Sequence, residues 1–520
     1  MKLDTIIING SGISLKSQRN KTNGTNLSIH LEEPLPSNSK LDIYCEWSYK
    51  IPLEPEFRRT GYYKDNAWFI GYFYPQIAVY DDIEFFSDMK GWDYMLFYTG
   101  VQEFYNDFNN YNVSIEVPEG FYVWATGSLE NTEEVYSKSI LESLEEASTT
   151  DKIVEIISRD DLNKELLVGN VWQFKADGVP DFAFGTAPNY LWEGTSVLIG
   201  DSRIFVDVAY HPESMLYPQV IEIAKNTVIY ASEVFPGIHY PYSHATTFNG
   251  NITGGMEFPM IANNLDTRDT TYLILVTSHE ITHNYIPFMM GFNEKRYHFM
   301  DEGLNTYISK RFLADEYGRD FYTDLFGSPR DRGIYGAYDY FFASTQDNTS
   351  IYNSYAQIDL NNFRYQYLTK PVVAFMLFAD MIGEDKFLSA FKEFVHRWKG
   401  KHPTPFDLFY TMNDVLKENY NWFWNTWFMD FGYPDLGIEM QDNQVIVKRM
   451  GARALPLPVN LTIEYKDGTS TTISKSMNIW KNGGKQVTIE IENLENIKSI
   501  SLDENSVPDI NHGNNYIEIY

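Results

Sequence analysis

The sequence of 520 residues predicts a multidomain α+β protein, with a β-rich N-terminal domain, a largely helical middle and a small C-terminal β-sandwich. Three observations support this prediction. Short alternating apolar and polar runs, separated by turn residues, fill the first part of the chain, which is typical of strands. From Pro212 onward apolar residues recur at three- and four-residue spacing, which is typical of helices. After residue 436 the alternation returns.

The N-terminal domain is expected to span residues 1–195. Runs such as TIIING, LSIHL and LDIYCEW, and later NVSIEVPEGFYVWATG, show the period-two alternation of half-buried strands. Within this domain, residues 129–165 are rich in Glu and Ser at helical spacing. We therefore expect a solvated helical insertion there.

Residues 196–435 are expected to form the second domain. They begin with a strand pattern and continue with long helical patterns, among them TTYLILVTSHEITHNYIPFMM and DEGLNTYISKRFLADEYG. Pro371 suits the first turn of a further helix, and Gly383 interrupts that pattern. Residues 436–520 hold a KDGT hairpin signal between two strand patterns, and we expect a small β-sandwich there.

The composition argues against several classes of protein. The formal net charge of -30 argues against nucleic-acid and anionic membrane partners, because both need clustered Lys and Arg. No stretch of about 18 apolar residues is present, so we expect no stable membrane insertion. The single cysteine, Cys45, excludes an intrachain disulfide and a metal site built from cysteines. The N-terminus lacks a signal-peptide pattern, so we expect a cytoplasmic protein if this start is native, and a periplasmic or secreted one if a signal was removed.

A metal-ligand pattern lies within one of the helical stretches. Residues 279–283 read HEITH, and residues four apart share one face of a helix, so His279 and His283 point together. Their imidazoles can take two corners of a zinc tetrahedron. Glu280 borders the same face without binding the metal, and can take a proton from a metal-activated water as the catalytic base.

The third metal ligand must come from a separate element, because a catalytic zinc usually has three protein ligands and one open position. Glu302 lies downstream in MDEGLNTY, at the start of the next helical pattern. A helix, a turn and a second helix would bring it beside the two histidines. The spacing therefore predicts one Zn²⁺ per chain on His279, His283 and Glu302, the arrangement called gluzincin.

A second motif, NITGGMEFPM, lies upstream and places Glu257 after two glycines and a methionine. Gly254 and Gly255 let a backbone approach a ligand closely. Taken in order, GGMEFP, HEITH and Glu302 resemble the zinc aminopeptidases typified by aminopeptidase N and leukotriene hydrolase. The expected order of domains is similar to that family as well.

The resemblance implies a fold and a set of roles. Residues 196–435 would hold a thermolysin-like zinc catalytic domain with a helical lobe. Glu257 would bind the free α-amine of the substrate, and Gly254, Gly255 and Met256 would line the substrate backbone. The resemblance thus implies an aminopeptidase that hydrolyses the N-terminal residue from peptides with a free N-terminus.

The same resemblance implies a tyrosine that stabilises the oxyanion, two residues before a lysine at a helix start. The sequence here reads NNFRYQYLTKPVVAF, and Leu368 occupies that place. Tyr367 lies one residue further back, and Tyr365 is also close. We favour Tyr367 as the oxyanion donor and keep Tyr365 as the alternative.

Other positions depart from the family pattern or were weighed as site residues. Phe258 stands where the family often has Asn after the glutamate. A second anchor for the amine is not obvious, with Asp65 and Glu103 as candidates. His298 and His244 lie near the motifs in sequence, and we interpret them as structural or pocket-lining residues.

Three other functions remain open alternatives. A gluzincin could act as an endopeptidase, or as an epoxide hydrolase on a lipid. A non-catalytic scaffold of the same fold is the third reading, but such proteins usually lose ligands, whereas this sequence keeps all three together with Glu280.

Overall fold

The computed structural model describes most of the chain, and the statements below concern residues 1–14, 20–53, 58–82, 90–97, 103–318, 321, 350–352, 365–450, 454–503 and 509–520. It is a mixed multidomain structure of helices and sheets, which divides into two compact units. The first unit holds residues 1–225 and 241–284, and the second holds residues 226–240 and 285–520. Each unit is described by itself.

The first unit begins with small β elements. A three-stranded sheet has the order β2-β1-β5, and two hairpins, β3–β4 and β8–β9, accompany it. The strands are β1 (Lys2–Ile8), β2 (Ser11–Gly12), β3 (Lys21–Asn23), β4 (Asn26–Ser28), β5 (Ile43–Ser48), β8 (Tyr80–Asp82) and β9 (Lys90–Trp92).

Two further sheets of the first unit enclose an aromatic core. Their strand orders are β10-β14-β12 and β11-β15-β7-β6. The core includes the buried rings of Trp124, Trp192 and Phe248, with ring centroids of Trp124 5.7 Å from Trp192 and 5.8 Å from Phe248. The strands are β6 (Thr60–Tyr62), β7 (Trp68–Ile70), β10 (Asn109–Glu116), β11 (Tyr122–Ala125), β12 (Ser128–Leu129), β14 (Val171–Val179) and β15 (Phe184–Ala187). The high aromatic content of the sequence therefore serves packing in this unit.

The Glu- and Ser-rich segment of the first unit contains two helices, α1 (Thr132–Val135) and α2 (Lys138–Thr149). Helix α2 buries Ile140 and Ala147 and contacts the neighbouring six-stranded sheet, while most of its charged residues stay at the surface. A narrow apolar stripe on an otherwise polar helix gives this pattern.

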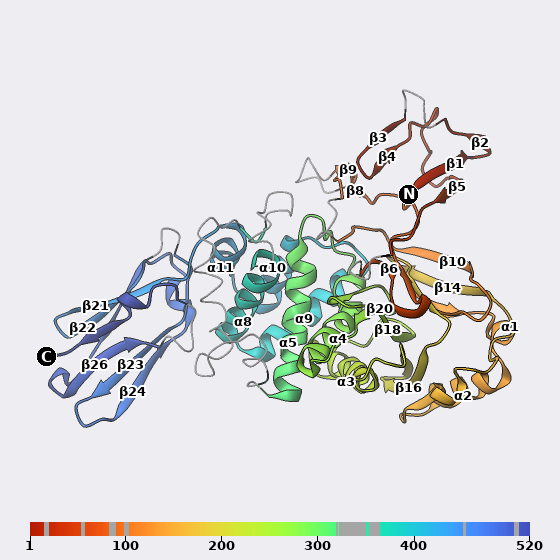
Figure 1. The fold of residues 1–520 in the computed structure, drawn as a ribbon. Helices are drawn as coiled ribbons and strands as arrows, with labels where there is room; N and C mark the ends of the chain where they lie inside the picture. The colour runs from red at the N-terminus through yellow and green to blue at the C-terminus, as the bar shows by residue number, and fades with distance from the viewer. Residues whose placement is uncertain are drawn as a thin grey trace. The chain divides into compact units, whose positions relative to one another are not determined.

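A six-stranded sheet forms the main framework of the first unit, with the order β13-β16-β17-β18-β20-β19. The central strands β17, β18 and β20 run parallel, and the outer pairs are antiparallel. Helix α4 (Thr270–Thr282) packs against β20 and the edge strand β19 (Figure 1). The strands are β13 (Val154–Ile157), β16 (Leu191–Ile199), β17 (Ser202–Tyr210), β18 (His244–Asn251), β19 (Gly255–Met256) and β20 (Ile261–Leu265).

A buried carboxyl group on β17 makes the stability of this sheet depend on pH. Asp207 accepts hydrogen bonds from the Trp192 indole at 2.7 Å and from the Thr246 hydroxyl at 2.6 Å. Burial raises the pKa of Asp207 to about 7, above the ordinary value of 3.8. Between these values the native protein binds more protons than the unfolded chain, so the free energy of unfolding falls as the pH rises through that window.

We expect Asp207→Asn to flatten this part of the pH profile. The amide can keep both contacts, by accepting from Trp192 and donating to Thr246. From about pH 5 to about pH 8, the unfolding free energy of the native protein should fall by on the order of 2 kcal/mol more than that of the variant. Urea denaturation at both pH values measures the difference, and parallel profiles would show that Asp207 is ionised throughout.

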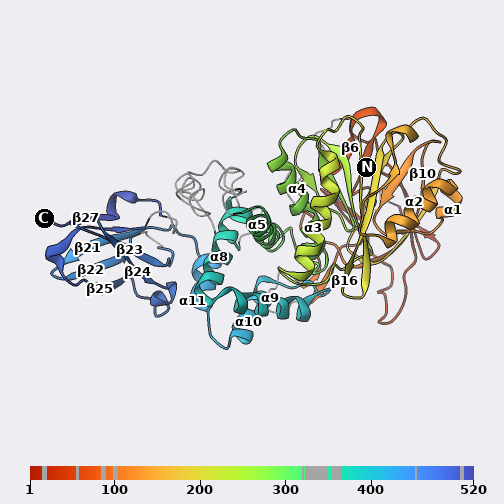
Figure 2. The ribbon, with the colours of Figure 1, turned by 90° about the horizontal axis from the view of Figure 1, so that it is seen from below.

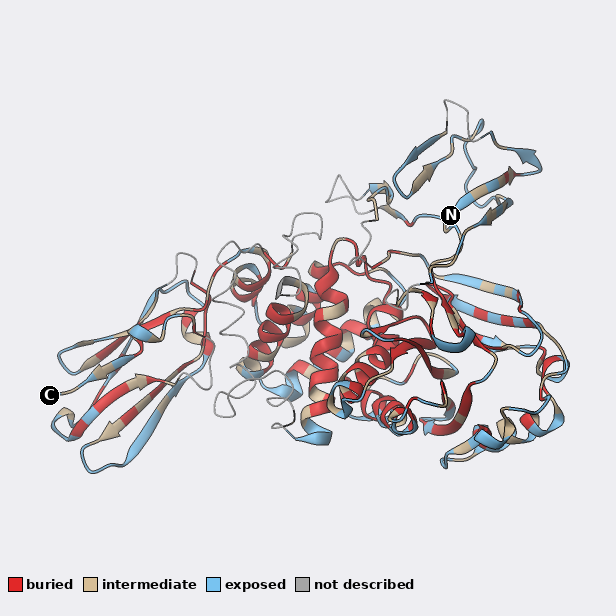
Figure 3. Ribbon diagram, in the orientation of Figure 1, coloured by how far each residue is buried: buried red, intermediate tan, exposed pale blue. Residues whose placement is uncertain are grey.

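The second unit contains most of the helices, and the helices α5 and α8 are buried along much of their length (Figure 3). Gly383, with a φ of 96°, separates α8 from α9. Helix α3 (Val220–Glu233) begins in the first unit and ends in the second. The other helices are α5 (Leu304–Tyr317), α8 (Lys370–Ile382), α9 (Glu384–Trp398), α10 (Pro405–Leu416) and α11 (Asn421–Trp424).

The end of the second unit is a C-terminal β region, formed by two sheets with the orders β21-β22-β25 and β24-β23-β26-β27 (Figure 2). Gly468, with a φ of 87°, lies in the turn of the β23–β24 hairpin. The strands are β21 (Leu436–Gln441), β22 (Gln444–Arg449), β23 (Val459–Tyr465), β24 (Ser470–Lys475), β25 (Gln486–Glu490), β26 (Ile497–Leu502) and β27 (Tyr516–Glu518). Among the described residues of the chain, no helix combines the length and the apolar character needed to cross a membrane.

Candidate active site

Helix α4 of the first unit and the residue directly after it supply three of the residues expected in the site. Its start is defined by Asp269, whose carboxylate accepts a hydrogen bond from the backbone N–H of Tyr272 at 3.1 Å. The helix is buried on most sides, which agrees with its apolar sequence. His279 and Glu280 lie in its last turn, and His283 directly follows it with helical backbone angles.

The two histidines converge as the spacing predicts. The Nε2 atoms of His279 and His283 lie 3.2 Å apart, and their ring planes cross at 86°. Two nitrogen ligands of one tetrahedral zinc, each at about 2.0–2.1 Å from the ion, are separated by about 3.3 Å. The separation of the two nitrogens therefore fits a shared zinc ion. His283 is fully buried, whereas His279 is half-buried.

Glu280 lies against the glycine segment upstream of the helix. The carboxylate and Cγ of Glu280 occupy the place where a side chain at Gly255 would begin, so any Cβ there would collide with them. Glu280 is only 4% exposed. The Glu280 carboxylate can therefore occupy this position only because residue 255 is a glycine. Its neighbour Gly254 has a φ of 67°, a backbone conformation that favours glycine.

The structure also brings Glu257 to this place. Ligand atoms of Glu257, Glu280 and His283 all lie within 4.8 Å of one another, although they come from the segment after β19 and from the end of α4. Glu257 is 5% exposed. Strand β19, which includes Gly255 and Met256, is an edge strand of the six-stranded sheet. An edge strand can pair with an extended peptide through its backbone.

An arginine that sequence analysis missed, Arg58, borders the same segment. Arg58 donates from Nη1 to the carbonyl of Gly255 at 2.8 Å. Burial and the neighbouring Arg59 lower the pKa of Arg58, whereas the negative charges of Glu103, Glu257 and Glu280 raise it. The raising effects together are larger, so the pKa of Arg58 lies above its ordinary value. The guanidinium of Arg58 is therefore a fixed positive charge within electrostatic reach of Glu257 and Glu280.

The candidates for a second amine anchor have other partners in the structure. Glu103 is 2% exposed, forms an ion pair with Arg59 and accepts a hydrogen bond from the Tyr72 hydroxyl at 3.3 Å. Asp65 is largely exposed and lies 2.8 Å from Nε2 of His211. The structure thus places Glu103 in the network of Arg58 and Arg59, and Asp65 in a contact with His211.

Phe258 and His244 have structural surroundings. The ring of Phe258 packs against Phe69 and Tyr72, with ring centroids at 5.5 and 4.8 Å. His244 lies 3.2 Å from the carbonyl of Ala125 through Nε2, and burial lowers its pKa to about 4. A neutral histidine in this environment contributes to packing.

In the second unit, Glu302 lies in a π-helical turn, Phe299–Gly303, directly before α5. It forms a group with His298 and Asp301, whose ligand atoms all lie within 4.8 Å of one another. His298 and Glu302 are four residues apart, a spacing that places two side chains on one helix face. That spacing is the signal by which sequence analysis could have selected His298.

Tyr367 also lies in the second unit, in the turn Tyr365–Thr369 that precedes α8. Its ring packs on His298, with centroids 4.5 Å apart. Gly303 directly follows Glu302. If Gly303 carried a Cβ, that atom would lie 3.0 Å from the backbone carbonyl oxygen of Tyr367. The structure therefore brings Tyr367 to the segment that holds Glu302. The side chain of Tyr365 lies outside the described part of the chain.

Comparison with known proteins adds information on the fold. No protein-family model and no curated protein matches the sequence. Among solved structures, the chain is similar to Legionella pneumophila aminopeptidase A, crystallised in complex with aspartic acid, with a TM-score of 0.65 and 14% sequence identity. The similarity covers 96% of this chain and 53% of that chain, so this chain spans about half the length of that protein. Over nearly its whole length, the chain therefore has the fold of part of a solved aminopeptidase.

Proposed function

We propose that the protein is a zinc-dependent aminopeptidase that hydrolyses the N-terminal residue from peptides. The observation that carries this proposal is the convergence of Glu257, Glu280 and His283 beside the edge strand β19. A base, an anion for the substrate amine and a metal-binding histidine then lie next to a backbone edge that can hold a peptide. The similarity to an aminopeptidase fold supports peptides as the substrate class.

His279, His283 and Glu302 would hold the zinc ion in this proposal. The distance between the two Nε2 atoms supports the histidine pair, and the position of Glu302 in MDEGLNTY, at the start of the next helical pattern, supports it as the third ligand. Two imidazoles and one carboxylate are a ligand set that catalytic zinc sites use. A bound zinc ion lowers the pKa of a water molecule and polarises the substrate carbonyl.

The residues of the chain supply the remaining steps of the proposed reaction. Glu280 takes a proton from the attacking water and passes it to the leaving amine, as general base and then general acid. Tyr367 donates a hydrogen bond to the oxygen on which negative charge develops. Glu257 pairs with the positively charged α-amine of the substrate, which fixes the first residue of the substrate and excludes internal peptide bonds.

Three substrate types test the proposal. We expect aminoacyl fluorogenic substrates to be cleaved, their N-acetylated forms to resist, and internally quenched peptides blocked at the N-terminus to remain intact. A zinc chelator should abolish the cleavage, and added zinc should restore it. Cleavage of the blocked peptides would favour an endopeptidase, and turnover of a lipid epoxide alone would favour an epoxide hydrolase.

Glu257→Ala should weaken recognition of the free amine. Because a charge-assisted hydrogen bond is lost, kcat/KM for an unblocked dipeptide should fall by about 10- to 100-fold. The preference for the unblocked over the N-acetylated substrate should fall with it. Glu193→Gln is a suitable control, because Glu193 is a half-buried carboxylate on β16 that accepts from the Tyr210 hydroxyl at 2.8 Å. An unchanged preference in Glu257→Ala would assign the amine to another residue.

Tyr367→Phe separates the two tyrosines proposed for the oxyanion. Removal of one oxyanion donor lowers kcat by about 10²–10³-fold, with a much smaller change in KM. We expect this loss in Tyr367→Phe and near-native kinetics in Tyr365→Phe. The reverse result would assign the role to Tyr365.

A further inference from the structure

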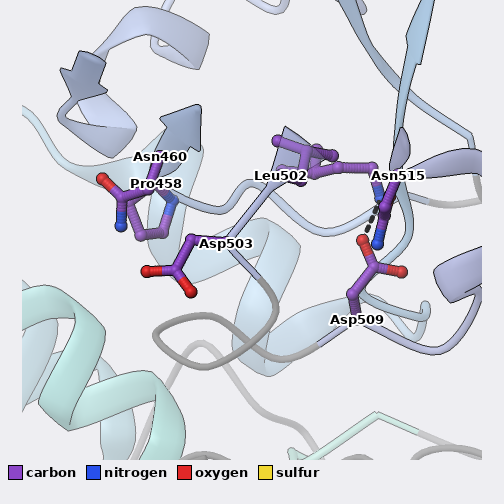
Figure 4. Close-up of a pocket in the computed structure, with 7 residues that line it drawn as sticks. Pro458, Asn460, Leu502, Asp503, Asp509 and Asn515 are labelled. Atoms are coloured by element: carbon purple, nitrogen blue, oxygen red, sulfur yellow. Dashed lines mark hydrogen bonds between the residues drawn. The ribbon is translucent and has the colours of Figure 1, made fainter. Parts of the chain in front are cut away.

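The C-terminal β region of the second unit contains a small cavity, lined by residues of β21, β23 and β26 and by their neighbours (Figure 4). Its volume is about 10 Å³, which is room for about one water molecule. A peptide side chain does not fit in that space. A contact of the first unit, in contrast, lies directly at the residues proposed for the reaction, because Arg58 binds the glycine segment against which Glu280 packs.

The backbone of Arg58 is fixed by the sheets of the first unit. Its carbonyl accepts a hydrogen bond from Nδ2 of Asn263 at 2.7 Å, and Asn263 is a fully buried residue of β20. Two residues after Arg58, strand β6 begins at Thr60 and pairs with β7. The side chain of Arg58 therefore extends from a well-held backbone to the edge strand β19, which is the neighbour of β20.

The guanidinium of Arg58 lies along the two glycines that precede Met256. Nη1 donates to the carbonyl of Gly255 at 2.8 Å, and it lies 3.5 Å from the place that a Cβ at Gly254 would take. Strand β19 has only two residues, so it forms few hydrogen bonds with β20. Glycine also has more backbone freedom than any other residue. The hydrogen bond from Arg58 therefore restricts a segment whose own sequence leaves it much freedom.

This restriction affects both carboxylates of the candidate site. The side chain of Glu280 packs where a Cβ of Gly255 would begin, so the Gly255 backbone forms one wall of the space that Glu280 occupies. Glu257 follows Gly255 by two residues, so its backbone belongs to the same short segment. A shift of Gly255 would therefore displace the proposed base and the proposed amine anchor together.

The charge of Arg58 acts on the same two carboxylates. Glu257 and Glu280 are both buried, and one carboxylate oxygen of each lies within 4.8 Å of the other. Two carboxylates this close repel each other when burial removes them from water. Arg58 is within electrostatic reach of both. Its hydrogen bond goes to a neutral carbonyl, whereas Arg59 forms an ion pair with Glu103. The charge of Arg58 therefore offsets the repulsion between Glu257 and Glu280.

We propose that Arg58 is a positioning residue of this site. Its guanidinium holds the Gly255 backbone, and its charge allows Glu257 and Glu280 to lie close together. Arg58 acts through these residues and not on the reacting atoms. The kinetic consequences of this role rest on the proposed aminopeptidase function, whereas its effect on the glycine segment does not depend on that function.

Three replacements in the full-length, zinc-loaded protein separate the two effects. Arg58→Lys keeps the charge and a donor, Arg58→Gln keeps a donor only, and Arg58→Met keeps neither. On an aminoacyl fluorogenic substrate, we expect kcat/KM to fall by at least about tenfold in Arg58→Met, less in Arg58→Gln and least in Arg58→Lys. Arg203→Met is the matched control and should keep native kinetics, because Arg203 is an exposed arginine of the six-stranded sheet that pairs with Asp151 at 2.7 Å. Native kinetics in Arg58→Met, or equal losses in Arg58→Met and Arg58→Lys, would overturn the proposal.

Amide hydrogen exchange tests the same role without relying on activity. In Arg58→Met, residues 252–257 should exchange at least about tenfold faster than in the native protein, while β16 and β17 exchange at native rates. If Arg58→Met fails to fold, Arg58→Gln takes its place in both measurements. Unchanged exchange at residues 252–257 would overturn the proposal even in an active aminopeptidase. Faster exchange in a protein whose native form cleaves no aminoacyl substrate would support the hold of Arg58 on Gly255 and contradict only the aminopeptidase function.

Discussion

Replacement of Glu280 by glutamine is expected to lower kcat by about 10²–10⁴-fold and to leave the zinc content unchanged. The carboxylate of Glu280 is buried against Gly255 and shares its surroundings with Glu257 and His283. Glutamine has nearly the same shape, so the contact with Gly255 remains, but its amide cannot accept and return a proton. Because Glu280 is not proposed as a zinc ligand, the metal should stay bound.

Steady-state kinetics on an aminoacyl fluorogenic substrate, together with metal analysis of the same samples, measure both parts of this prediction. Circular dichroism serves as the control for folding. An active Glu280→Gln enzyme would remove Glu280 from the role of base. A variant without zinc would instead place Glu280 among the metal ligands.

Replacement of Gly255 by alanine should have the second largest effect. A Cβ at this position would collide with the side chain of Glu280, and the collision involves buried atoms near the carboxylate end. The base must therefore shift or rotate. A misplacement of about 1 Å in a catalytic group can lower the rate by about 100-fold, so we expect a loss of that order in kcat/KM.

Gly12→Ala is the control for this experiment. Gly12 lies in the edge strand β2, where a Cβ would meet no other atom within 4 Å. This variant should keep native kinetics, and both variants should keep native circular dichroism spectra and zinc content. Native activity in Gly255→Ala would show that Glu280 can move without loss, and would contradict its proposed position as base.

Part of the geometry of the candidate site could be predicted from the sequence because the residues concerned lie in short local patterns. The i, i+4 spacing of HEITH is enough to bring two imidazoles together on any helix, and the apolar surroundings indicated that helix correctly. Two glycines before Glu257 indicated a close approach to the backbone, although the sequence did not show that the approaching group is Glu280.

Other features depend on contacts between distant parts of the chain, which one sequence does not reveal. Arg58 donates to the carbonyl of Gly255, which lies 197 residues later in the chain, and no local pattern marks it. Glu103 was considered as an amine anchor, but its ion pair with Arg59 depends on the packing of separate strands. The π-helical turns that hold Glu302 and Tyr367 directly before α5 and α8 also lie outside what apolar periodicity predicts.

The zinc stoichiometry of the protein tests the central claim most directly. Equilibrium dialysis against zinc, followed by metal analysis, should give one tightly bound zinc per chain in the native protein. Because His283 and Glu302 are proposed as ligands, His283→Ala and Glu302→Gln should each lose that zinc and the peptidase activity, while Glu280→Gln should keep the metal. A protein that binds no zinc, or a Glu302→Gln variant that binds it with native affinity, would contradict the proposed metal centre.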